Sequence, residues 1–191
     1  PLSVIEPPVF VPLEELLDES GRFVFAALQH YCKSHSKENF QELVDYPILV
    51  GSTYFPGAVW HRGGKGNNPD AQDGFQDLLA GCLVPLVKNT ASKEDAGTFL
   101  IGRSPAADLR MEGTTIAEQH ARIEVKEGRL ILLDMDSPGG TSVNEAMLRP
   151  FVPREIHAGD RIGFGQHYFV FLAPERLYLN MLKAQEFSRF R

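Results

Sequence analysis

The stretch Arg122-Ile123-Glu124-Val125-Lys126 alternates charged with apolar residues. Successive side chains of a strand point to opposite faces, so this alternation places Ile123 and Val125 on a core and the charged residues in water. Similar short apolar segments recur on both sides of this stretch at intervals of about 8 to 12 residues, a spacing typical of β-sandwiches and barrels. The predicted strands are Leu83–Val87, Thr98–Ile101, Leu109–Met111, Ala121–Val125, Leu130–Leu133, Leu148–Phe151, Arg161–Phe164 and Tyr168–Leu172.

Helical spacing of apolar residues appears on both sides of this β region. Before it, Pro12 precedes a first short amphipathic helix, Ser36 caps a later one, and Pro47 ends that helix. A strand is predicted at Ile48–Val50, and a closing helix after Pro174. The apolar positions of the predicted helices are Leu13, Leu16, Leu17, Phe23, Ala27, Leu28, Tyr31, Phe40, Leu43, Val44, Leu177, Leu179, Met181 and Leu182.

These patterns divide the chain into four segments. Residues 1–60 form an N-terminal helical extension with a strand, and residues 61–80 form a loop or linker rich in Gly, Asn and Asp. Residues 81–173 form the β-sandwich, and residues 174–191 contain the C-terminal helix. The predicted fold class is therefore mainly β, with helices at both ends, and the N-terminal helices are expected to pack on the sandwich to cover their apolar faces.

Composition narrows the classes of function. The chain has 191 residues and a formal net charge of -6, which argues against nucleic-acid binding because such domains carry a basic excess. It contains two cysteines, too few for a disulfide framework, and no apolar run of membrane-spanning length. The start lacks the layout of a secretory signal. We therefore expect a cytoplasmic protein without a membrane contact.

Motifs for cofactors and catalysis fail on spacing. Cys32 and His35 lack the second ligand pair that zinc requires, and Gly63-Gly64-Lys65-Gly66 lacks the spacing of a phosphate-binding loop. Aligning a calcium loop on Gly74 places Pro69 and Ala71 where carboxylates are needed. No nucleophile elbow or metalloprotease helix motif occurs. The sequence predicts no enzyme activity, no metal and no cofactor.

Three loop motifs lie in order within the β region. They are Gly102-Arg103-Ser104, His120-Ala121, and the run from Asp134 through Gly139-Gly140-Thr141-Ser142-Val143 to Asn144. Together they resemble the forkhead-associated (FHA) domain family, from about residue 81 to about residue 173. The resemblance implies an eleven-stranded sandwich whose loops at one end bind a peptide, usually one carrying phosphothreonine. A phosphothreonine carries nearly two negative charges, so its receptor needs a fixed cation and neutral donors.

The resemblance also assigns roles to single positions. In the family, the arginine at position 103 and a serine at position 117 hold the phosphate, and an asparagine at position 139 holds the peptide backbone. Gly102 and His120 match the residues that shape and brace the loops, and Asn144 matches a further structural position of the motif. This sequence instead has Ala117 and Gly139 at the two other positions, and Glu118 adds a carboxylate beside them.

These departures leave two interpretations open. A hydrogen bond to a charged group contributes about 1.5 to 3 kcal/mol, so losing two donors lowers affinity roughly a thousandfold. The favoured interpretation is a protein-interaction module with a degenerate phosphate site that binds a protein partner independently of phosphorylation. The alternative is a phosphothreonine-binding adaptor in Ser/Thr kinase signalling, with Thr114, Thr115, Gln119 or Ser142 supplying the missing donor.

Under either interpretation the ligand site lies on the same loops. Arg103 is open to a second role, as an ion-pair partner of Glu118 or Asp136. The N-terminal helices are open to a third interpretation, as an enzyme fragment or an oligomerisation element. The predicted ligand-binding residues are Arg103, Ser104, Thr115, Ala117, Glu118, Gly139, Gly140, Thr141 and Ser142, and the predicted structural ones are Gly102, His120 and Asn144.

Overall fold

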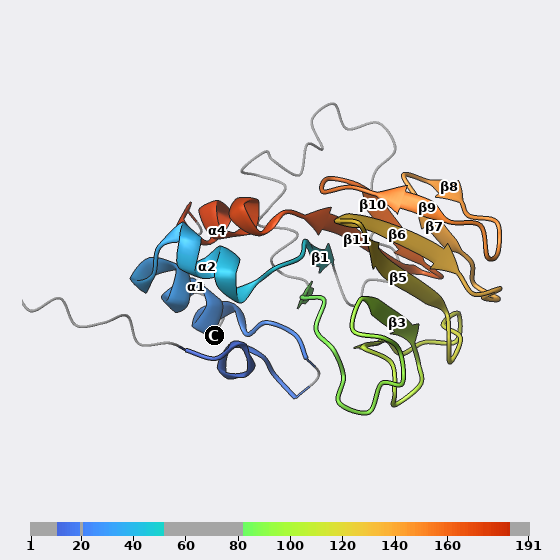
Figure 1. The fold of residues 1–191 in the computed structure, drawn as a ribbon, viewed down its shortest axis with the longest axis horizontal. Coiled ribbons are helices and arrows are strands. Elements are labelled where there is room, and N and C mark those ends of the chain that lie inside the picture. Colours follow the sequence, from blue (N-terminus) through green and yellow to red (C-terminus); the bar gives the residue numbers. More distant parts are fainter. Residues whose placement is uncertain (1–10, 20, 52–81, 184–191) are drawn as a thin grey trace, which may run out of the picture.

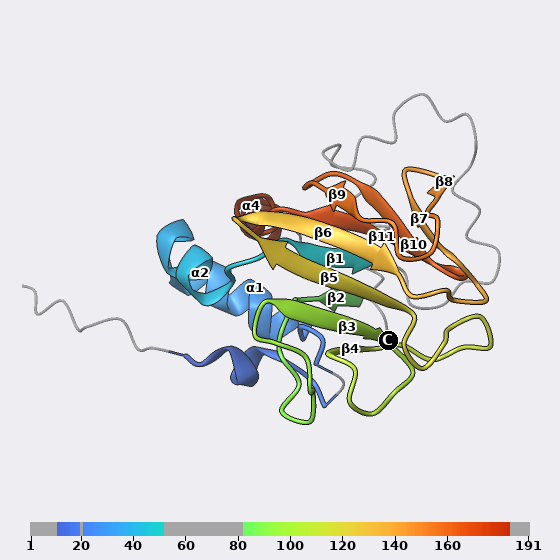
Figure 2. The ribbon, with the colours of Figure 1, turned by 45° about the vertical axis from the view of Figure 1, so that its right-hand side comes forward.

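A computed structural model describes residues 11–19, 21–51 and 82–183. Its strands form two sheets that stack face to face, as Figure 2 shows, where β5 and β6 pass in front of β1 and β11. The strands are β1 (Ile48–Gly51), β2 (Cys82–Val84), β3 (Thr98–Gly102), β4 (Leu109–Arg110), β5 (Ala121–Lys126), β6 (Arg129–Asp134), β7 (Thr141–Val143), β8 (Ala146–Met147), β9 (Arg154–Ile156), β10 (Arg161–Phe164) and β11 (His167–Leu172).

The first sheet has six strands in the order β2-β1-β11-β10-β7-β8, and the second has five in the order β4-β3-β5-β6-β9. Neighbouring strands are antiparallel except β3 and β4, which pair in parallel. β1 lies between β2 and β11, with Val50 opposite both Leu83 and Val170. A strand from the N-terminal region is therefore an inner strand of the sandwich.

The helices gather at one end of the molecule and the β-sandwich extends away from them, as Figure 1 shows. They are the 3-10 helix η1 (Leu13–Leu16) and the α-helices α1 (Phe25–Ser34), α2 (Lys37–Leu43) and α4 (Pro174–Lys183). The Ser36 hydroxyl caps α2 by accepting a hydrogen bond from the Asn39 amide at 3.3 Å. Two long-range bonds join the terminal helices, from Gln29 Nε2 to the Met181 carbonyl and from the Tyr178 hydroxyl to the His35 carbonyl.

Two hydrophobic cores meet along β1. Ile48 and Val50 belong to the core under the helices, whereas Leu49 belongs to the core between the two sheets. This division follows from the two-residue period of a strand, which sends alternate side chains to opposite faces. Because both faces of β1 are covered, Ile48, Leu49 and Val50 are all at most 1% exposed. The helices therefore form a third layer on the outer face of the six-stranded sheet.

The predicted fold class is confirmed, while several boundaries differ. The structure contains the predicted strand at 48–50, the helix capped by Ser36 and the closing helix after Pro174. The predicted strand at Leu148–Phe151 is wrong, because this segment is a turn in which Phe151 has a φ of 61°. The short strands β7, β8 and β9 were not predicted, since two or three residues give too little periodicity to detect.

Candidate functional site

The loops at the end of the sandwich away from the helices are joined by backbone hydrogen bonds. The Arg103 amide donates to the Ala117 carbonyl at 2.9 Å, and the His120 amide donates to the Ile101 carbonyl at 2.8 Å. Gly102 lies between these two bonds. A Cβ on Gly102 would come within 3.0 Å of the Ala117 and Glu118 carbonyl oxygens, closer than real Cβ atoms approach. Glycine is therefore required here for the two loops to meet.

His120 braces the loops from a fully buried position. Its Nδ1 accepts a hydrogen bond from the Ala117 amide at 3.2 Å, and its Nε2 lies 3.1 Å from the Gly140 carbonyl. An amide can only donate, so Nδ1 is unprotonated and Nε2 carries the hydrogen. Burial is the main cause that lowers the pKa of His120, while the bond to Gly140 and the charge of Asp134 oppose this shift. The neutral ring connects the loop before β5 with the loop before β7.

Asp134 forms a second buried polar centre at this end. It is 2% exposed, and its carboxylate accepts hydrogen bonds from the Thr141 hydroxyl at 2.6 Å and from the hydroxyl and amide of Ser137. The Ser137 oxygen lies 3.2 Å from His120 Nε2, so the carboxylate and the imidazole belong to one network. The motifs in the sequence did not predict a role for Asp134 or Ser137. The Asp-x-x-Ser spacing could have indicated this contact in advance, since an aspartate side chain often accepts hydrogen bonds from nearby backbone amides in turns.

Arg103 is exposed, and one nitrogen of its guanidinium is already used. Its Nε donates to the Ile116 carbonyl at 2.6 Å, which holds the side chain over the loop before β5. Among the described residues no carboxylate lies within 4.0 Å of this guanidinium, so the proposed ion pair with Glu118 or Asp136 does not form. Within the described residues, the two terminal nitrogens have neither a hydrogen-bond partner nor an ion-pair partner.

Thr115 and Gly139 bring the loops before β5 and β7 into direct contact. A Cβ on Gly139 would lie within 3.0 Å of the Thr115 carbonyl oxygen and 3.0 Å from both Gly165 Cα and Thr115 Cβ. The Thr115 hydroxyl also accepts a hydrogen bond from the Gln166 amide at 3.2 Å. Position 139 therefore has no space for an asparagine side chain without movement of the backbone.

The other predicted ligand residues differ in their exposure. Ala117 is half-buried and Glu118 is exposed beside it. The Ser104 hydroxyl accepts a hydrogen bond from the Ala106 amide and so caps its own turn. Thr141 is fully buried against Asp134, and Ser142 is 8% exposed. The structure thus brings the predicted residues to one end of the sandwich, and it leaves Arg103 and Glu118 as the exposed charges.

Asn144 forms the turn between β7 and β8. It has a φ of 49°, in the left-handed region that asparagine tolerates better than most residues. Its side-chain oxygen accepts a hydrogen bond from the Arg161 amide at 2.9 Å, and its nitrogen donates to Asp160 at 2.7 Å. These bonds tie the hairpin to the start of β10.

Asp108 organises the loop between β2 and β3, a role that sequence reasoning missed. Its side chain is 0% exposed and accepts hydrogen bonds from the Asn89 and Leu100 amides, both at 2.8 Å. The ammonium group of Lys88 lies 3.1 Å from it and also donates to the Thr98 carbonyl. This buried charge is therefore paired and hydrogen-bonded, as a stable fold requires.

In residues 11–19, 21–51 and 82–183, no three His, Cys, Asp or Glu side chains are placed to hold a metal ion together. Cys32 is 1% exposed, and burial raises the pKa of its thiol to about 12. No helix in these ranges is both long and apolar enough to span a bilayer.

Comparisons with known proteins find a family and several relatives that are similar to this chain. The sequence profile of the FHA domain family matches residues 99–165. The chain is 32% identical over 115 residues to the oxoglutarate dehydrogenase inhibitor of Corynebacterium efficiens, covering 58% of this chain and 78% of that protein. It is 29% identical over 107 residues to the glycogen accumulation regulator GarA of Mycolicibacterium smegmatis, covering 53% of this chain and 66% of that one. The solved structure of the FhaA FHA domain complexed with the intracellular domain of Rv3910 is 27% identical with a TM-score of 0.36, over 41% of this chain and 82% of that chain.

Proposed function

Because the chain belongs to the FHA domain family, we propose that it is a protein-interaction module that binds its partner without requiring a phosphate. The contact surface is the loop end of the sandwich, where Arg103, Ser104 and Glu118 lie beside the turn at Gly139 and Gly140. The module is a regulator rather than an enzyme. The two relatives support this role, since one is named an inhibitor and the other a regulator.

The contact between Gly139 and Thr115 is the observation that carries the proposal. Because a Cβ at position 139 would collide with the Thr115 carbonyl oxygen, the two loops are closer together than an asparagine side chain allows. The peptide-binding amide expected from the family resemblance is therefore absent, and its space is filled by backbone. Closure of this kind is harder to reverse than a surface substitution, because it needs a backbone shift.

The phosphate side of the site is weakened independently. Ala117 has no hydroxyl, and the exposed Glu118 carboxylate adds a negative charge next to it. Two missing donors cost about 3 to 6 kcal/mol, which corresponds to a loss of roughly two to four orders of magnitude in affinity. Arg103 does not replace these donors, because it already occupies its own phosphate-binding position in the family pattern.

A second function is favoured by one specific feature, the terminal nitrogens of the exposed Arg103, which have no partner within the described residues. A guanidinium held by its Nε, without a carboxylate partner in the described ranges, matches the bidentate geometry by which arginine binds phosphate. The alternative is therefore a phosphothreonine-binding adaptor in kinase signalling. Thr115 would then have to supply a donor, although its hydroxyl already accepts a bond from Gln166.

Matched arrays of threonine and phosphothreonine peptides separate the two functions. We expect unphosphorylated peptides to bind the wild type, with dissociation constants that change less than about twofold in Arg103→Ala, because exposed charges contribute little. Arg129→Ala is the control, since Arg129 is an exposed arginine at the start of β6, away from the loops that carry Arg103. Binding that requires the phosphate and disappears in Arg103→Ala would establish the adaptor function instead.

A gain-of-function variant provides a second arm. Ala117→Ser/Glu118→Arg restores a hydroxyl and removes the opposing carboxylate while leaving the Gly139 contact in place. If substitutions at positions 117 and 118 caused the loss of phosphate binding, this double variant should bind phosphothreonine peptides more tightly than the wild type does. An unchanged preference would mean that these two positions do not determine phosphate recognition.

A further inference from the structure

The segment from Arg149 to Arg154 is an exposed turn outside the loops that carry the predicted site. Every residue in it is exposed, including two large apolar ones, Phe151 at 58% and Val152 at 50%. Met147, at the end of β8 just before it, is 64% exposed. Exposed apolar residues are unremarkable singly, but three within six positions concentrate exposed apolar surface on one segment, as interaction sites do.

The backbone of this turn is anchored and strained. Phe151 has a φ of 61°, an outlier for a bulky residue that costs about 1 to 3 kcal/mol. Its amide donates to the Asp134 carbonyl at 2.9 Å, and the Leu148 amide donates to the Thr141 carbonyl at 2.8 Å. These bonds tie the turn to the buried Asp134 network. In this conformation the Phe151 side chain is 58% exposed, so little of it is buried by the described residues.

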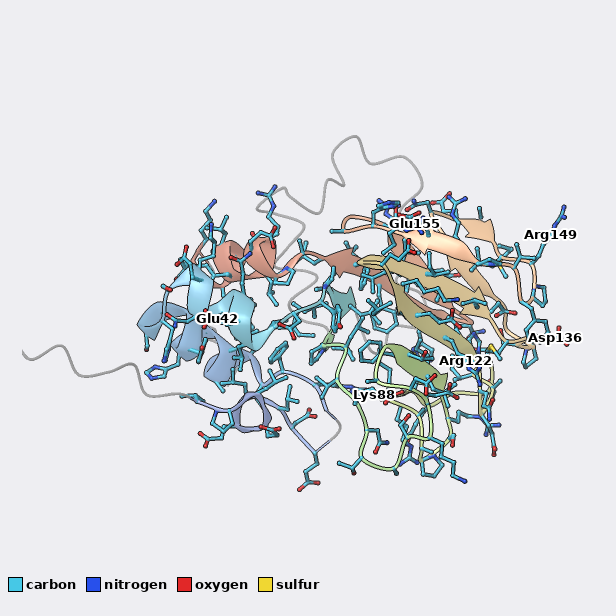
Figure 3. The ribbon with its side chains drawn as sticks, viewed as in Figure 1. Glu42, Lys88, Arg122, Asp136, Arg149 and Glu155 are labelled. Carbon is cyan, nitrogen blue, oxygen red and sulfur yellow. The ribbon has the colours of Figure 1, made fainter. Side chains whose placement is uncertain are left out.

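The arginines at the two ends of the turn, Arg149 and Arg154, form no ion pair with any residue that the structure describes. Within the described ranges no carboxylate lies within 4.0 Å of Arg149 or Arg154, whereas Arg122 and Arg129 both form ion pairs. Figure 3 shows Arg149 extending away from the sandwich at the end opposite the helices. Apolar residues between two unpaired guanidinium groups complement a partner that combines apolar side chains with carboxylates.

The turn also touches the proposed interaction site. The end of the Met147 side chain lies over Gly140, so close that a Cβ on Gly140 would collide with it. Gly140 follows Gly139 directly, and its carbonyl bonds to His120. Met147 therefore lies against the loop end of the sandwich, and one extended partner segment can contact Met147 and these loops together.

We infer that Met147, Arg149, Phe151, Val152 and Arg154 form a docking surface for an unphosphorylated protein segment containing apolar residues together with Asp or Glu. This inference rests on the proposed function, which it deepens by naming the chemistry of the partner. Phe, Met and Arg are enriched at the centres of protein interfaces, where a few such residues provide most of the binding energy. The Phe151 ring is the anchor of this surface, and the two arginines select for acidic residues.

Three sets of unphosphorylated peptides test the inference by fluorescence anisotropy with the full chain. Each set has the same apolar residues, combined with Asp and Glu, with Asn and Gln, or with Lys. The acidic set should bind most tightly. Phe151→Gly, which suits the positive φ and removes the ring, should weaken that binding at least about tenfold, as expected for a buried aromatic side chain.

Charge variants test the second part of the surface. Arg149→Ser/Arg154→Ser should weaken binding of the acidic set and reduce its dependence on salt, because exposed charges are screened by ions. Arg129→Ser is the matched control, since Arg129 is exposed but paired with Glu127 and Glu155. Equal binding of the three peptide sets, or equal loss in the control, would overturn the assigned partner chemistry.

The remaining outcomes separate this inference from the proposed function. If the acidic peptides bind but respond to Glu118→Arg and not to Phe151→Gly, the docking surface is wrong and the proposed function stands. If only phosphothreonine peptides bind and Arg103→Ala abolishes binding, both fail. Binding of phosphatidylserine vesicles that is lost in Phe151→Gly would overturn the inference in favour of a membrane contact.

A folding control excludes a purely structural role for the ring. Phe151→Gly should leave the midpoint of thermal unfolding within roughly 4 °C of the wild type, because the relief of strain offsets the entropy of the added glycine. A larger decrease would mean that the ring supports the fold, and the inference would be overturned.

Discussion

The two ends of the molecule are stabilised by different kinds of interaction. At the helical end the fully buried side chains are apolar, such as Leu28, Phe40 and Leu177, each at 0% exposure. At the loop end the buried groups include His120 at 0% and Asp134 at 2%, which are joined by directional hydrogen bonds. Apolar packing depends on volume and shape, whereas the polar network depends on the position of each donor and acceptor.

This difference explains how the loop end can lose ligand chemistry and keep its shape. The bonds that join the loops use backbone groups, His120 and Asp134, and none of them uses a side chain at position 117 or 118. Substitutions at those exposed or half-buried positions change what the surface recognises without removing a brace. A recognition surface on such a scaffold can therefore change its ligand at little cost in stability.

The largest expected effect concerns the helical end. Leu177→Ala removes a fully buried side chain of α4 and should lower the free energy of unfolding by about 2 to 5 kcal/mol. Leu179→Ala, in the same helix but 40% exposed, is the matched control and should cost less than about 1 kcal/mol. Chemical denaturation followed by circular dichroism measures both changes.

The same experiment tests whether the two ends unfold together. Ile48 and Val50 of β1 pack under the helices while Leu49 packs between the sheets, so a loss at α4 should destabilise the whole sandwich. The Leu177→Ala transition should remain single and shift to lower denaturant. Two separate transitions would show that the helices unfold independently of the sandwich. The two ends of the molecule would then be two domains.

An intermediate effect is expected at the loop end. Gly139→Ala places a Cβ within 3.0 Å of the Thr115 carbonyl oxygen and should destabilise the protein by about 1 to 3 kcal/mol, as overpacking does. Gly97→Ala is the control, because a Cβ there would meet its nearest atom, the Val125 carbonyl oxygen, at an ordinary 3.5 Å. Equal stability of the two variants would mean that the Gly139 loop moves easily and that an asparagine fits there after all.

Sequence patterns predicted the parts of the fold that repeat. Alternation over several residues identified β5, and a capping serine before an apolar stripe identified α2. β8 has two residues, and the Phe151 turn depends on a bond to Asp134 that is distant in sequence. Such long-range contacts can override the conformation that the residues prefer locally. For this reason the segment at 148–151 was incorrectly predicted as a strand.

The candidate site was predictable in its location but not in its geometry. The order of the motifs at Gly102, His120 and Asn144 indicated which loops meet. The sequence did not reveal that the Gly139 backbone fills the space of the missing side chain, because this depends on how closely Thr115 approaches. A glycine in a sequence looks the same whether it gives flexibility or permits a close contact.

The smallest expected effect is a pH dependence of stability that originates at His120. Because its pKa is lowered in the folded protein, the unfolded chain binds more protons below about pH 6.5, so stability decreases as the pH falls. The slope from this group is at most about 1.4 kcal/mol per pH unit, and it disappears above the unfolded pKa. His120→Gln should be less stable than the wild type at neutral pH and should lose this part of the slope. His157→Gln, at an exposed histidine, should keep it, and a wild-type slope in both variants would show that another group titrates.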